Sequence, residues 1–119
     1  GFAIEQYVLS QGKYGILREY GGHGIGTEMH QEPHVLNFGR KGSGPTIVPG
    51  MALAIEPMIN LGKRQITVDK DGWTIRTQDR KASAHFEHTV GVGKDGPQIL
   101  TTFSYIEEVL KTSTGLLNI

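Results

Sequence analysis

One seven-residue stretch, Met51-Ala-Leu-Ala-Ile-Glu-Pro57, places an acidic side chain inside an otherwise apolar alternating pattern. As a strand, it has one face of large apolar side chains and a second face of two alanines and Glu56. The Glu56 side chain is then expected to be uncrowded, because the alanines on its face of the strand are small. A carboxylate in an apolar strand is costly to bury unless it is paired or holds a cation. Glu56 therefore either reaches water at the end of the strand or belongs to a site.

Two further segments carry side chains that could join Glu56. In Gly21-Gly-His-Gly-Ile-Gly26 the spacing matches neither nucleotide-binding fingerprint and no lysine follows, which argues against a phosphate cradle. Glycines on both sides leave the ring of His23 unshielded and open to a ligand or metal. The stretch Ser83–Val92 alternates again, so that His85, Glu87 and Thr89 share one face of the predicted strand.

His23, Glu56 and Glu87 are widely separated in the sequence, and each lies on a different predicted strand or strand end. One imidazole and two carboxylates form a ligand set suited to Mn, Fe(II), Co or Zn. Spacing alone does not show that the three side chains converge. The sequence alone also does not decide the role of His30, which stands beside Gln31. It is either a solvated loop histidine or a part of the same site.

Composition limits the class of protein. With 119 residues, 37% of them hydrophobic, the chain suits one modest globular domain. The twelve basic and twelve acidic residues give a formal net charge of zero. No excess of positive charge therefore indicates nucleic acid or an anionic membrane as a partner. The absence of cysteine excludes disulfide scaffolds and thiolate metal sites. No apolar run reaches the length of a membrane span, and no leader opens the chain, which predicts a cytoplasmic location.

The remaining pattern predicts a helix, then mainly antiparallel strands, then a second helix, which is typical of an α+β domain. The expected elements are a helix over 1–12, strands over 14–20, 51–57, 64–68, 73–77, 83–92 and 98–103, and a helix over 104–110. Two-residue turns are predicted at Asp71-Gly72 and Asp95-Gly96, and a surface loop over 37–45. Ser104 is expected to cap the second helix, and residues 111–119 to form a disordered tail.

Six blocks appear in an order that closely resembles type I methionine aminopeptidases. They are Gly22-His-Gly-Ile-Gly26, His30-Gln-Glu-Pro33, Pro49-Gly-Met51, Ile55-Glu-Pro-Met-Ile-Asn60, Asp71-Gly-Trp73 and Phe86-Glu-His-Thr89. The resemblance runs from about Gly1 to Phe103. Proline-specific aminopeptidases and prolidases share the His, Glu-Pro and Glu positions, so a proline-specific relative is the alternative. Met58, Asn60, Trp73 and His88 favour the methionine enzyme.

The resemblance implies a pita-bread fold, in which two αβ halves enclose two divalent ions. This chain would be the C-terminal half, a curved antiparallel sheet with flanking helices. It implies that His23 and Glu56 bind one metal and that Glu87 bridges both. His30 would hydrogen-bond the scissile amide, and Trp73 would line the pocket for the methionine side chain.

The same resemblance implies a mechanism and exposes two departures. Two cations would activate a water molecule and polarise the substrate carbonyl, and Glu56 would carry the proton to the leaving amine. The two aspartates and the further histidine that the family uses come from a half of the fold that is not in this sequence. In addition, His85 stands where glutamine is expected, and we hypothesise that it is an extra ligand or a partner of a ligand.

Two functions therefore stay open. The chain supplies half of the dinuclear site of an enzyme that removes N-terminal methionine from nascent proteins and peptides, completed by the missing half or by a second copy. Alternatively, it is an inactive fragment or pseudoenzyme that acts as a binding or self-associating module. On either reading the isolated chain is predicted to be inactive or nearly so.

Overall fold

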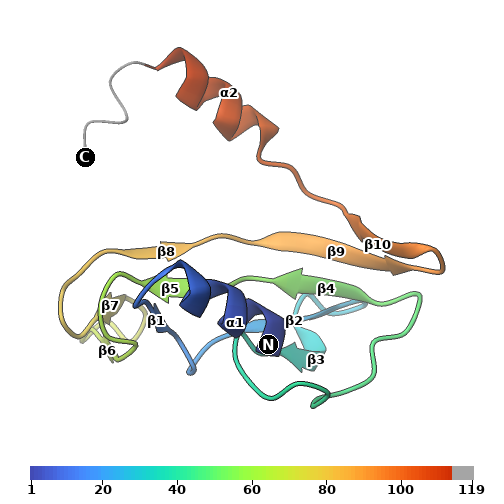
Figure 1. Cartoon of the computed structure of the whole chain (residues 1–119), viewed down its shortest axis with the longest axis horizontal. Helices are drawn as coiled ribbons and strands as arrows, with labels where there is room; N and C mark the ends of the chain where they lie inside the picture. The colour runs from blue at the N-terminus through green and yellow to red at the C-terminus, as the bar shows by residue number, and fades with distance from the viewer. Residues whose placement is uncertain (114–119) are drawn as a thin grey trace.

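The computed structural model describes residues 1–113, and Figure 1 shows how their helices and strands are arranged. The elements in chain order are α1 (Phe2–Gln11), β1 (Gly15–Ile16), β2 (Gly22–Ile25), β3 (Gln31–Val35), β4 (Ala52–Ile55), β5 (Met58–Asn60), β6 (Ile66–Val68), β7 (Ile75–Thr77), β8 (Ser83–His85), β9 (His88–Gly93), β10 (Gly96–Ile99) and α2 (Ser104–Thr112). Neither described helix has the length and apolar character needed to cross a bilayer.

The strands form three antiparallel sheets. The five-stranded sheet has the order β10-β9-β4-β2-β3, the three-stranded sheet has the order β1-β5-β8, and β6 pairs with β7. In Figure 1, β8 leads directly into β9, and β4 and β5 run beside them. The two larger sheets thus lie end to end along the same pair of chain segments, which preserves the predicted α+β class.

The interruption between these two sheets falls at the two candidate carboxylates. The sequence predicts one strand over 51–57 and one over 83–92, but the first ends at Ile55, before Glu56-Pro57, and the second is broken at Phe86-Glu87. Pro57 has no backbone N–H to donate to a neighbouring strand, which accounts for the gap on its side. Pairing resumes without a shift, because Ile55 lies opposite His88 before the gap and Met58 lies opposite His85 after it.

Two turns and several strands also differ from expectation: the predicted strand 14–20 is reduced to β1, the strand predicted over 98–103 begins and ends earlier as β10, and β2, β3 and β5 lie outside the predicted strands. Val68 pairs with Ile75, so the first hairpin has a six-residue connection over 69–74 instead of a two-residue turn. Gly93 pairs with Gly96, which places the second turn one residue earlier than predicted. β3 was not predicted, because its central Pro33 argues against a strand. Its place at the edge of the five-stranded sheet explains how the proline is tolerated.

Both predicted helices are present, with differences at the ends of α2. Ser104 is the first helical residue and not the cap; the hydroxyl of Thr102 instead accepts a hydrogen bond from the Ser104 N–H, at 3.1 Å. The helix continues through Lys111 and Thr112, which lie in the predicted tail. Residues 114–119 of that predicted tail lie outside the described part of the chain.

The apolar core of the described chain is small. Its buried members are Ile16, Leu17, Leu53 and Ala54. Leu53 and Ala54 are adjacent on β4 and point to opposite faces, so the middle of this strand is covered on both sides. Neither helix contributes a buried residue, and α2 stands apart from the sheets in Figure 1.

Candidate metal centre

The structure brings His23, Glu56 and Glu87 together. Each offers one ligand atom, and these three atoms lie within 4.8 Å of one another. Ile55 pairs with His88 and Met58 pairs with His85. The same register places Glu56 opposite Glu87 in the break between the sheets. Opposite residues on antiparallel strands have Cβ atoms about 4.5–5.5 Å apart, and like charges in that position repel. The strand pairing therefore creates a close pair of carboxylates that a cation would stabilise.

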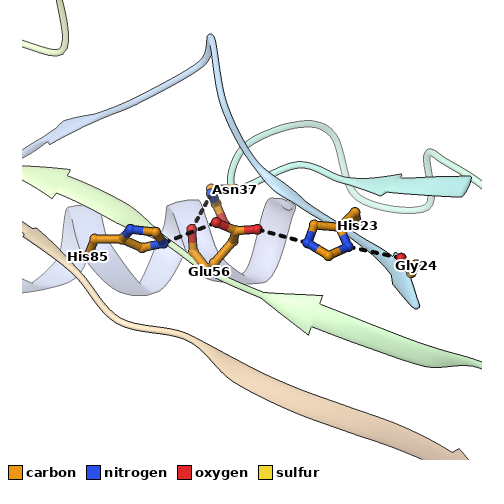
Figure 2. Close-up of polar contacts among 5 residues, drawn as sticks. All are labelled: His23, Gly24, Asn37, Glu56 and His85. Carbon is orange, nitrogen blue, oxygen red and sulfur yellow. Dashed lines mark hydrogen bonds and ion pairs between the residues drawn. The ribbon is translucent and has the colours of Figure 1, made fainter. Parts of the chain in front are cut away.

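His23 reaches this pair from the neighbouring strand. On β2 it lies opposite Ala54, two residues before Glu56 and thus on the same face of β4. Its Nε2 is 3.5 Å from a carboxylate oxygen of Glu56, and its Nδ1 is 2.9 Å from the carbonyl oxygen of Gly24. Because a carbonyl only accepts, we assign the proton to Nδ1. In the neutral ring this leaves a lone pair on Nε2, facing the carboxylate (Figure 2).

The glycines beside His23 are required by the close approach of neighbouring strands. A Cβ atom on Gly22 would overlap the carbonyl oxygen of Ala54 on β4. A Cβ atom on Gly24 would overlap the carbonyl oxygen of Glu32 on β3. Any larger residue at either position would push β2 away from a partner strand and displace His23.

The main chain at Glu56 is held by Asn37, a residue that sequence reasoning missed. Asn37 is fully buried, and its Nδ2 donates a hydrogen bond of 3.2 Å to the Glu56 carbonyl oxygen (Figure 2). The prediction that residues 37–45 form a surface loop is therefore wrong for its first member. A lone asparagine ahead of a glycine-rich loop gives no sequence signal of burial.

His85 also contacts the cluster. Its Nε2 lies 3.0 Å from the second carboxylate oxygen of Glu56, so the carboxylate stands between two imidazoles (Figure 2). Glu56 is largely buried, with 14% of its side chain exposed, whereas His85 is 49% exposed. Both close side-chain contacts that the described structure shows for the Glu56 carboxylate are thus with histidines.

The other two predicted site residues have different surroundings. His30 is exposed, and its ring centroid lies 4.3 Å from that of His23, beside the cluster. Trp73 lies in the connection between β6 and β7 and is 86% exposed, and none of the contacts around Glu56 involves it. The indole therefore does not enclose a pocket within the described chain, and its role in lining one stays a prediction.

These residues fit a divalent cation. An imidazole lone pair and two carboxylates face one another, and donors of this kind suit borderline and hard divalent metals. Such a set repels itself without a positive charge among its members. The ligand roles of the three residues remain predictions.

Comparison with known proteins agrees with this chemistry. The sequence pattern of metallopeptidase family M24 matches residues 1–94. The methionine aminopeptidase of Clostridium acetobutylicum is 50% identical over 99 residues, which cover 83% of this chain and 39% of the relative. That of Escherichia coli K12 is 46% identical over 101 residues, which cover 85% of this chain and 38% of the relative.

Solved structures show the same similarity. The crystal structure of methionine aminopeptidase from Rickettsia prowazekii aligns with a TM-score of 0.80 at 48% identity, covering 84% of this chain and 40% of that protein. The Thermotoga maritima enzyme aligns with a TM-score of 0.79 at 43% identity, covering 83% and 39%. The expected resemblance and the pita-bread class are confirmed, although the chain spans only about two fifths of the length of these relatives. By sequence and by structure, the chain belongs to metallopeptidase family M24.

Proposed function

We propose that this chain supplies part of a dinuclear site for the metal-dependent removal of N-terminal methionine from nascent proteins and peptides. The observation that carries the proposal is the convergence of His23, Glu56 and Glu87 in a member of family M24 whose relatives are named methionine aminopeptidase. Because the chain covers about two fifths of these relatives, the remaining ligands have to come from another polypeptide segment. We propose that residues 1–119 act as one region, the C-terminal half of the domain.

The proposed roles are those that the family resemblance implies, and the geometry of the cluster is compatible with them. Nε2 of His23 and the nearer oxygen of Glu56 would hold one divalent ion, and Glu87, the most exposed of the three, would be a ligand of both that ion and a second. Bound metal ions of this type lower the pKa of a coordinated water and polarise a carbonyl. Glu56 would accept the proton of that water and pass it to the leaving amine. His30, beside His23, would hydrogen-bond the scissile amide, and Trp73 would line the methionine pocket once another segment covers it.

The proposed partners follow from the same reasoning. The substrate is the free N-terminus of a peptide or nascent chain, which implies a cytoplasmic location. The site would be completed by the missing half of the fold or by a second copy of this chain. The metal is Mn, Fe, Co or Zn, all of which accept mixed imidazole and carboxylate ligands.

Metal binding by the chain is the direct test. Isothermal titration of the 119-residue chain with Co²⁺ or Mn²⁺ should show weak binding of a single ion, reversed by a chelator. Glu87→Gln should weaken binding at least about tenfold, because the carboxylate is a direct ligand. Glu107→Gln, which removes an equal charge on α2, is the matched control and should change nothing. Equal affinities for the wild-type chain and the Glu87 variant would contradict the proposed site.

Activity should require the rest of the domain. Purified chain alone is expected to release no measurable methionine from a Met-peptide, since the aspartate ligands are missing. Release should appear, and be chelator-sensitive, when the part of the Clostridium acetobutylicum relative that this chain does not match is added. Rapid release by the chain alone, or none after a folded complex has formed, would refute the half-site proposal.

A self-associating module is the second candidate. It is favoured by α2, whose apolar side chains Tyr105, Ile106, Val109 and Leu110 are each at least 40% exposed. Contiguous exposed apolar surface commonly marks an interaction site. Sedimentation velocity over a range of concentrations would support this function if a dimer forms with no gain of metal-dependent activity, and a monomer at all concentrations would exclude it.

A further inference from the structure

We propose that His85 is a positioning residue that fixes the carboxylate of Glu56 by hydrogen-bonding one of its oxygens, which leaves the other oxygen directed at His23 and the metal. The inference rests on the proposed metal site and adds a residue whose role the family resemblance does not supply, because glutamine was expected at this position. It also chooses between the two hypotheses for His85, an extra ligand and a partner of a ligand.

Strand pairing puts His85 on the opposite side of Glu56 from His23. His85 lies opposite Met58, two residues after Glu56, whereas His23 lies opposite Ala54, two residues before it. Residues two apart on a strand share a face, so the carboxylate is flanked by an imidazole on each side. The two contacts use different oxygens: Oε2 for His85 at 3.0 Å, and Oε1 for His23 at 3.5 Å.

The chemistry of the shorter contact decides what His85 can do. An ionised carboxylate only accepts hydrogen bonds, so Nε2 of His85 has to carry the proton that is donated to Glu56. A nitrogen that carries a proton has no lone pair for a metal ion. Nε2 of His85 therefore serves Glu56 and not the metal, in contrast to Nε2 of His23.

Positioning matters here because a glutamate side chain has several rotatable bonds and two equivalent oxygens. Asn37 fixes the main chain of Glu56 but does not touch its carboxylate. His85 fixes the far end of the side chain, so the two contacts together define its direction (Figure 2). Partners that orient a ligand in this way commonly change metal affinity by about 10–100-fold.

The first experiment measures Co²⁺ affinity of the 119-residue chain by titration calorimetry. His85→Ala should weaken binding about tenfold, and His85→Gln should stay within about threefold of wild type, because the amide also offers an N–H donor. His34→Ala is the matched control: it removes an exposed imidazole from β3 and should leave the affinity unchanged. Equal losses for the alanine and glutamine variants would overturn the proposal, since they would indicate that the imidazole itself is needed as a ligand.

The second experiment follows ¹⁵N-labelled histidine rings by NMR and does not depend on metal binding. In the metal-free chain, Glu56→Ala should shift the ring resonances of His85 and leave those of His34 unchanged. On addition of Zn²⁺ to the wild-type chain, His23 should take the shift of a metal-bound nitrogen, and His85 should keep its Nε2 proton.

The two proposals can fail separately. If no Zn²⁺ binds but Glu56→Ala still shifts His85, the metal-site proposal fails and the positioning contact stands. If Glu56→Ala leaves His85 unchanged, or if Zn²⁺ displaces the His85 proton, the positioning role is refuted even where the metal site is intact. The spectra of each variant also report whether it is folded, and His85→Gln provides a reading should the alanine variant unfold.

Discussion

Glu56 is the residue on which the neighbouring contacts converge. Its carbonyl oxygen accepts from Asn37, and its carboxylate faces His23 on one side and His85 on the other. With 14% of the side chain exposed, these contacts act in a partly desolvated setting, where each hydrogen bond matters more than at the surface. In the proposed function, a glutamate held at both ends would be suited to proton transfer, because its geometry would be set before a substrate arrives.

Asn37→Ala should lower the free energy of unfolding by about 1–3 kcal/mol, because it leaves the Glu56 carbonyl oxygen without its buried donor. Urea unfolding followed by circular dichroism provides the measurement. The control is Gln11→Ala on α1, where the amide is exposed and its loss should have little effect. Equal stabilities of the Asn37 variant and wild type would show that water replaces the lost contact.

The sequence predicted the candidate ligands but not what positions them. His23, Glu56 and Glu87 could be named because His23 stands in a run of glycines, Glu56 interrupts an apolar strand, and Glu87 lies on the polar face of an alternating strand. Asn37 could not, since its burial depends on a contact with a residue 19 positions away. Long-range packing of this kind leaves no trace in local sequence.

At the scale of elements, the connection between β6 and β7 is organised by one carboxylate. Asp71 accepts hydrogen bonds from the Thr74 hydroxyl at 2.6 Å and from the backbone N–H groups of Trp73 and Thr74. These donors, the Thr74 hydroxyl above all, hold the pKa of Asp71 below its ordinary value of 3.8. The six-residue loop is therefore an ordered turn, and Trp73 is carried on it.

The stability of this turn should depend on acid. Because the folded pKa of Asp71 lies below the unfolded one, the unfolded chain takes up the proton first as pH falls. The contribution of Asp71 is thus complete above its ordinary pKa of 3.8 and is lost as pH falls through the folded pKa. Carboxyl titration by NMR should show the lowered pKa in wild type and a value closer to 3.8 in Thr74→Val. An unchanged pKa in that variant would show that the hydroxyl is not the main cause.

The presence of helices and strands was predicted better than the residues at which they begin and end. The segments over 51–57 and 83–92 were recognised as strands from alternation, which continues through residues where backbone pairing has stopped. β3 was missed because proline disfavours a strand, and only its place at a sheet edge, a property of the whole fold, makes Pro33 acceptable. Both hairpins were recognised from Asp-Gly pairs, but their registers were not, because register depends on which partner residues pack together.

The whole molecule exposes more surface than a chain of its length usually does. Its accessible area is 9215 Å², whereas a compact monomer of 119 residues exposes about 6,300 Å². The six residues outside the described part of the chain account for at most about 1,000 Å² of the difference. The Cα radius of gyration, 16.2 Å, also exceeds the value of about 13.5 Å expected for this length. Both quantities agree with a chain that matches only part of its relatives.

Urea denaturation should reflect this open shape. The slope of unfolding free energy against urea concentration scales with the area exposed on unfolding, so it should be about a quarter smaller than for compact domains of equal length. The slope should rise when the complementing segment of an M24 relative is bound, since more surface is then buried. A normal slope for the chain alone would mean that it closes on itself or associates in solution.

The unshifted register across the sheet break also limits how this region can change. The last pair before the gap is Ile55 with His88, and the first pair after it is Met58 with His85. Glu56 faces Glu87 only because both chain segments have the same number of residues between these two pairs. A single-residue insertion or deletion in either segment would turn one carboxylate to the opposite face, whereas matched changes in both would keep them together. Loops elsewhere in the chain can vary in length, but these two segments have to gain or lose residues in step.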